Sequence, residues 1–184
     1  MKNNILIFAI ILLASTAVSA QKYFTRTAEV KFFSEAPTEN IEADNSQVTC
    51  ILNTENGELA FSVQLMGFHF EKALMEEHFN ENYVESHKYP KSTFKGKVLH
   101  FDKIDITKDG KHSITVEGEM SLHGETNSIK ADGEILVEGE KILLTSKFDL
   151  KIEDYKIDIP KAVINKIAES IEISMKATLT EYKK

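Results

Sequence analysis

Apolar and polar residues alternate along most of this chain. In the segment 114–122, Ile, Val, Gly, Met and Leu take every second position, with Thr, Glu and Ser between them, and 129–137 repeats the pattern. A period of two is typical of a β-strand with one apolar face and one wet face. The remaining stretches with this pattern bring the prediction to about eight strands: 28–32, 48–52, 59–65, 94–98, 142–150 and 171–179.

Turn signals separate these stretches and favour antiparallel neighbours. Asn-Gly and Asp-Gly pairs tolerate positive φ and are strong hairpin signals. The pairs that lie between alternating stretches are Asn56-Gly57, Asp109-Gly110, His123-Gly124 and Glu138-Gly139. Two segments break the alternation, and their apolar spacing predicts a helix over 71–84 and a second, short helix over 161–169.

The fold class that satisfies this pattern is all-β. Closing eight antiparallel strands into a lipocalin-like barrel removes the exposed edges and gives every apolar face the same interior. A two-sheet sandwich is the alternative, because alternation does not separate the two architectures. A membrane barrel is disfavoured, since the chain has no Trp and shows no aromatic girdles.

The first twenty residues change the expected location. Lys2, the apolar run 5–14 and the small residues Val18-Ser19-Ala20 have the layout of a cleavable secretory signal. We therefore expect residues 1–20 to be removed and 21–184 to form one domain, periplasmic or secreted, without a stable membrane anchor. The net charge of −7 argues against nucleic acid as a partner.

Sequence motifs for catalysis or metal binding are weak. The chain has no G-x-S-x-G elbow and no P-loop, and its single cysteine, Cys50, lies among apolar strand residues where a thiol lacks activation. Glu77, His78 and His87 lack the spacing that makes a zinc signal specific. We expect no enzyme activity, no catalytic residues, no metal and no cofactor.

The interior of such a barrel is either packed with side chains or holds one ligand. Gly96, Gly118 and Gly133 fall on the apolar side of three successive strands, where they either open a slot or mark bends needed for curvature. A slot suits a long apolar chain, and then Gly118→Leu would reduce lipid binding without unfolding the protein. The predicted cavity lining is Phe61, Val63, Leu65, Phe94, Gly96, Val98, Val116, Gly118, Met120, Gly133, Ile135, Leu144, Phe148, Ile173 and Met175.

The order of several motifs resembles that of the YceI-like family over nearly the whole chain after residue 20. The motifs are Phe70, Glu77-His78-Phe79, the segment 88–94 with its Tyr89-Pro90 pair, the strand and turn at 116–126, and the segments 148–157 and 171–175. The resemblance implies an exported lipocalin-like barrel that binds a polyisoprenoid or similar lipid. It also supports placing His78, Tyr89 and His123 at the cavity mouth, although each has a purely structural alternative.

The chain departs from the family pattern just before His78. Most members carry an Arg-Asp pair there, whereas this chain has Met75-Glu76, and 29–32 replaces the usual His-Ser pair of the first strand. If that arginine holds the head group of the ligand in relatives, this protein is expected to bind a ligand with a different or neutral head group, such as a quinone. The expected partner is a polyisoprenoid, quinone or fatty chain, and a homodimer is possible. The alternative function is an envelope stress or interaction module with a filled core.

Overall fold

The computed structural model describes residues 22–35, 40–159 and 168–183. The predicted signal peptide, 1–20, and nearly all of the predicted helix 161–169 lie outside the described residues. The described strands are β1 (Lys22–Ser34), β2 (Ile41–Asn53), β3 (Glu58–Gln64), β4 (His69–Phe70), β5 (Lys91–Val98), β6 (Gly110–Leu122), β7 (Glu125–Glu138), β8 (Lys141–Lys151) and β9 (Ser170–Glu181).

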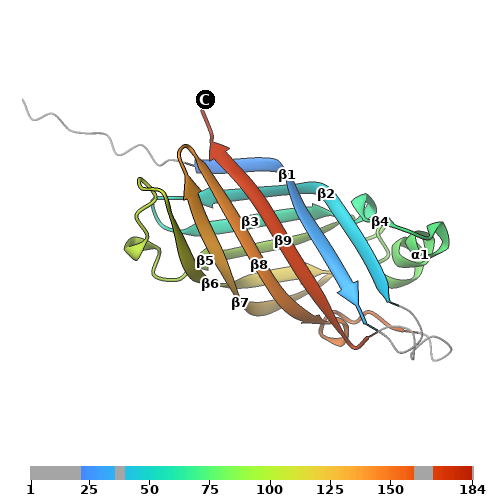
Figure 1. Ribbon diagram of the computed structural model, residues 1–184. Coiled ribbons are helices and arrows are strands. Elements are labelled where there is room, and N and C mark those ends of the chain that lie inside the picture. Colours follow the sequence, from blue (N-terminus) through green and yellow to red (C-terminus); the bar gives the residue numbers. More distant parts are fainter. Residues whose placement is uncertain (1–21, 36–39, 160–167, 184) are drawn as a thin grey trace, which may run out of the picture.

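All of these strands belong to one antiparallel sheet that closes on itself (Figure 1). The order is β1-β9-β8-β7-β6-β5-β3-β2-β4, and pairing of β1 with β2 joins the two sides. Because β4 is only two residues long and is attached to β2, the barrel proper has eight strands. The predicted closed barrel is therefore confirmed, and the sandwich is excluded.

The connections follow the turn chemistry in three of four places. Gly57, Gly124 and Gly139 all have positive φ, as tight turns at these positions require. Asp109-Gly110 is different, because it ends a longer connection that contains the 3-10 turn η3 (Phe101–Lys103). Asp109 instead accepts a hydrogen bond from the Gly139 N–H, at 2.7 Å, and so holds the β7–β8 hairpin.

The predicted helix over 71–84 is present in a shorter and less regular form. It consists of α1 (Ala73–His78) followed directly by a π-helical turn, η2 (Phe79–Tyr83). Both belong to the connection between β4 and β5, and Figure 1 shows α1 at the opposite end of the barrel from the C-terminus. The 3-10 turns η1 (Leu65–Gly67) and η4 (Ile152–Tyr155) complete the described helical segments.

The end of the barrel where β1 begins and β9 ends is filled with side chains. Its inward side chains are almost wholly buried: Val48, Cys50, Leu52, Val98, Ile135, Val137, Ile142, Ala177 and Leu179. Burial raises the pKa of the Cys50 thiol far above its ordinary value, so this cysteine is a small core hydrophobe. Each buried Val, Leu or Ile contributes about 1.5–3 kcal/mol, so this end contributes strongly to the stability of the domain.

Ladder pairing is interrupted at two places toward the other end. Pairing of β2 with β3 stops at Val48 and Val63, and beyond it the buried Asn45 donates to the Gln64 carbonyl at 2.7 Å. Pairing of β7 with β8 stops at Gly133 and Ser146, although both strands continue. These two ladders thus end before the strands do at the end that carries α1, whereas β1 has its register shifts nearer the packed end, between Phe24 and Val30.

Candidate functional site

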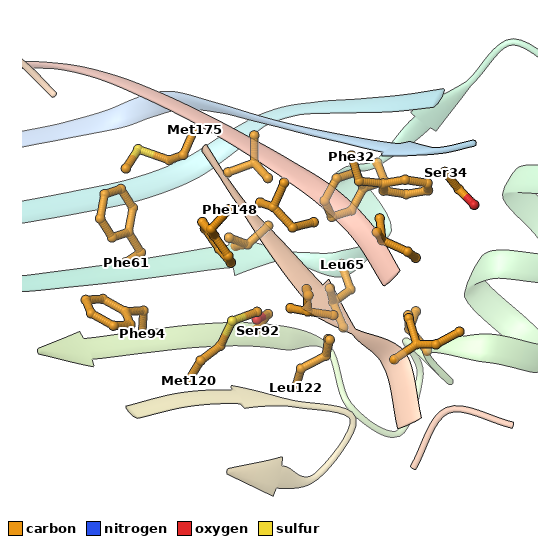
Figure 2. Close-up of a pocket in the computed structure, with 18 of the residues that line it drawn as sticks. Phe32, Ser34, Phe61, Leu65, Ser92, Phe94, Met120, Leu122, Phe148 and Met175 are labelled. Atoms are coloured by element: carbon orange, nitrogen blue, oxygen red, sulfur yellow. The ribbon is translucent and has the colours of Figure 1, made fainter. Parts of the chain in front are cut away.

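A cavity of about 500 Å³ occupies the end of the barrel that carries α1. This volume lies within the range of about 300–1,000 Å³ usual for ligand pockets. In Figure 2, side chains from strands on all sides point into the cavity, among them Phe61, Phe94, Met120, Phe148 and Met175. The barrel therefore has a filled half and a hollow half.

The predicted lining agrees with the cavity wall over most of its length. The predicted residues that line it are Phe61, Val63, Leu65, Phe94, Val116, Met120, Gly133, Leu144, Phe148, Ile173 and Met175. They share the apolar side of their strands, and closure of the sheet turns that side inward. The period-two pattern thus identified these wall residues before any tertiary information.

Four predicted lining residues do not contact the cavity. Val98 and Ile135 are fully buried in the packed end, because they lie nearer to the chain termini than the cavity floor. Gly96 and Gly118 face each other across β5 and β6. A Cβ on Gly118 would lie 2.4 Å from the Gly96 Cα and from the Lys95 carbonyl oxygen, so the pair permits close approach of two strands.

The predicted glycine slot is therefore wrong at two of its three positions. Gly133 does line the cavity, but a Cβ there would meet the Thr145 carbonyl oxygen at 2.5 Å. Strand curvature and close packing, the alternative interpretation, explain Gly96 and Gly118. Gly118→Leu would therefore disturb the fold, contrary to the prediction from the sequence, because a side chain at this position pushes β5 and β6 apart.

The serines in the cavity wall are satisfied by the protein itself. The Ser92 hydroxyl donates to the Ser121 carbonyl at 3.0 Å, and the Ser146 hydroxyl donates to the Asp132 carbonyl at 2.7 Å. Ser34 accepts a hydrogen bond from the Ala168 N–H at 2.9 Å. Because these hydroxyls have partners, the wall presents an almost entirely apolar surface to an occupant.

A cluster of four phenylalanines forms one side of the cavity near α1. Phe32 contacts Phe68, Phe70 and Phe79 with ring centroids 5.4–5.7 Å apart, and Phe79 also contacts Phe68 and Phe70. All four line the cavity. None of the four was among the predicted lining residues. Phe32 lies on the apolar side of β1, whereas Phe68, Phe70 and Phe79 lie between β3 and β5, where alternation gives no signal.

The three predicted mouth residues separate into two groups. His78, at the end of α1, lines the cavity and is exposed, as is Lys72 of the same connection, whereas the neighbouring lining residue Met75 is half-buried. Tyr89 and His123 do not line the cavity. Their rings contact each other with centroids 4.9 Å apart, which is the structural role weighed against the mouth assignment.

His123 links three segments of the barrel rim. Its Nδ1 lies 3.0 Å from the Tyr155 carbonyl oxygen and its Nε2 lies 2.8 Å from Glu85 Oε2. The Tyr155 carbonyl can only accept a hydrogen bond, so Nδ1 is the donor in that contact. The hydrogen bond to His123, helped by Lys88, lowers the pKa of the Glu85 carboxyl.

Within residues 22–35, 40–159 and 168–183, no group of three or more His, Cys, Asp or Glu side chains could hold a metal ion. The same residues contain no helix of the length and hydrophobicity needed to cross a membrane. What the described geometry offers is an apolar cavity with a few polar groups at its rim.

Comparisons with known proteins agree with this architecture. A polyisoprenoid-binding domain from Saccharophagus degradans superimposes with a TM-score of 0.75 at 13% identity, over 88% of this chain and 98% of that one. BcnA from Burkholderia cenocepacia gives 0.68 at 11% identity, over 83% and 96%. The YceI protein of Campylobacter jejuni gives 0.63 at 16% identity, over 82% and 90%.

These structural likenesses establish the fold. A comparison of the sequence with curated proteins finds no match. The family model of the YceI-like domain matches residues 17–179, which is most of the chain and includes every strand from β1 to β8 and most of β9. This protein belongs to the YceI-like family.

Proposed function

We propose that this protein is a non-enzymatic carrier that holds one long apolar molecule in the hollow half of its barrel. The observation that carries the proposal is the cavity of about 500 Å³ with an apolar wall. Burial of each methylene of a ligand stabilises the complex by about 0.8 kcal/mol. Affinity should therefore increase with chain length until the cavity is full.

The ligand classes that fit are a polyisoprenoid, a quinone and a fatty chain. The polyisoprenoid is favoured because the neighbouring domain from Saccharophagus degradans is described as polyisoprenoid binding. The only basic side chains in the described wall are Lys72 and His78, both exposed at the rim. A neutral or weakly polar head group at the rim suits this arrangement better than a strongly anionic one deep inside.

Export follows from the sequence of residues 1–20, whose layout is that of a cleavable signal. In the periplasm or outside the cell, a carrier keeps a water-insoluble chain dispersed. The packed end of the barrel does not need the ligand for its stability, so we expect the empty protein to be folded and able to take up its cargo.

The alternative is an interaction module with a filled core. Only the packed end of the barrel agrees with it, because the other end contains the cavity. Native mass spectrometry of the 21–184 protein purified from its own host distinguishes the two, and it also reports whether a homodimer forms. A stoichiometric long-chain adduct, or uptake of added geranylgeraniol, palmitic acid or a short-chain quinone, supports the carrier. A clean unliganded mass with no uptake of any of the three overturns it.

A further inference from the structure

The two strands that part at the hollow end enclose an opening in the barrel wall. The β7–β8 ladder runs from Glu138 and Lys141 only as far as Gly133 and Ser146. Beyond that point β7 continues for residues 125–132 and β8 for residues 147–151, and these residues have no cross-strand partners in the described β7–β8 register. The two strands are therefore joined by a ladder at one end and not at the other.

Cavity-lining side chains lie along both sides of this opening. On β7 they are Ile129 and Ala131, and on β8 they are Phe148 and Leu150. Ile129 and Phe148 are only half-buried, whereas the inward residues nearer the packed end are fully buried. The unpaired parts of β7 and β8 thus border the cavity directly.

The 3-10 turn η4 covers the opening. It begins directly after β8 and crosses to the start of β7, so that β7, β8 and η4 outline a triangle with its apex at Gly133 and Ser146. Ile152 and Ile157 of this segment are buried and line the cavity. The segment around η4 therefore serves as a strap whose apolar side completes the wall.

Three polar contacts fasten the strap to the neighbouring strands. The Asn127 amide donates to the Asp154 carbonyl at 2.6 Å, and Lys156 forms an ion pair with Glu125 at 2.9 Å. His123 Nδ1 donates to the Tyr155 carbonyl at 3.0 Å. Detachment of the strap from β7 would break these three contacts and expose the buried side chains of Ile152, Tyr155 and Ile157, but it would break no β7–β8 ladder bonds along 125–132.

We propose that the opening between β7 and β8 is the lateral portal through which an apolar chain enters and leaves the cavity, and that η4 is its movable strap. This inference rests on the proposed carrier function. A side portal lets a long chain slide in sideways between two strands, so its whole length need not thread through the rim beside α1. The portal also adjoins the wall residues that the chain contacts once bound.

The test compares variants that loosen the strap with a matched control. Lys156→Gln removes the ion pair to Glu125, and Asn127→Ala removes the bond to Asp154. The control, Lys130→Gln, removes an equally exposed ion pair from the same strand, but that pair joins β7 to β6 through Glu117 at 2.7 Å. None of these residues lines the cavity.

The measurement is the release rate of dansyl-undecanoic acid from loaded protein, followed by stopped-flow fluorescence after mixing with excess palmitic acid. Each lost strap contact should raise the open population up to about fivefold, which corresponds to about 1 kcal/mol. We expect the Asn127→Ala/Lys156→Gln double variant to release the probe at least about fivefold faster, with uptake faster by the same factor and Kd unchanged. Lys130→Gln should match the wild type.

Two results would overturn the inference in distinguishable ways. Tight probe binding with equal release rates in all variants rejects the portal and leaves the carrier function standing. No binding of the probe to the wild type, in agreement with a negative result for all three lipids above, rejects the carrier and the portal together. Thermal unfolding of each variant by circular dichroism verifies that it is folded before rates are compared.

Discussion

A larger side chain inside the hollow half should displace ligand without harming the fold. Val63 on β3 lines the cavity, is half-buried and has empty space in front of it. Val63→Phe adds about four carbon atoms, which exclude about as many ligand methylenes. At about 0.8 kcal/mol each, the loss is about 3 kcal/mol, or roughly 150-fold in Kd. The unliganded protein should unfold at the same temperature or higher.

The same substitution at the packed end provides the matched control. Val137 is almost wholly buried and lies outside the cavity lining. Val137→Phe should therefore lower the free energy of unfolding by about 1–3 kcal/mol through overpacking, with Kd unchanged. Titration with dansyl-undecanoic acid and urea unfolding measure the two quantities. The reasoning is refuted if Val63→Phe destabilises the protein as Val137→Phe does and binds the probe as tightly as the wild type.

Three further predictions concern the rest of the barrel. Gly118→Ala should strongly lower the urea concentration at the unfolding midpoint, because the new Cβ clashes with the backbone of β5. Gly110→Ala should not, because there is room for a Cβ at that position. Equal midpoints would contradict the close approach of β5 and β6 as the reason for Gly118. The lowered pKa of Glu85 means that its contact with His123 stabilises the fold above the ordinary carboxyl pKa and is lost as pH falls through the lowered value. The wild type should thus exceed Glu85→Gln in unfolding free energy at neutral pH and lose that advantage as the pH falls below the ordinary carboxyl pKa and through the lowered one. A difference that does not depend on pH would refute this assignment. The Cys50 thiol is fully buried and has a raised pKa, so it should react with a thiol reagent only after unfolding. Fast labelling of the native protein would contradict its burial.

Alternation along the chain was enough to predict the barrel and much of its inner surface. Phe61, Met120 and Met175 are inward-facing because they share the apolar side of their strands, and that property is readable from a period of two. The turns at Gly57 and Gly124 were also predicted from neighbouring residues alone, because glycine adopts the positive φ that tight turns require.

What alternation does not contain is position along the barrel axis. Val98 and Val116 face each other on neighbouring strands and both lie on the apolar side, yet only Val116 borders the cavity. The difference depends on which side chains the other strands supply at that height. The partner of His123 is equally non-local, because Glu85 lies 38 residues away and meets it only after the barrel closes.

The cavity and the packed end of the barrel depend on largely different residues, which affects where the binding site can be changed. Substitutions around Val63 or Phe148 alter the shape offered to cargo, while cohesion of the domain depends on Leu52, Ile135 and Leu179 at the other end. Leu144 belongs to both sets, because it is almost wholly buried and also lines the cavity. The shape of the cavity is therefore easiest to change at half-buried wall positions such as Val63, where a substitution leaves the packed end unaltered.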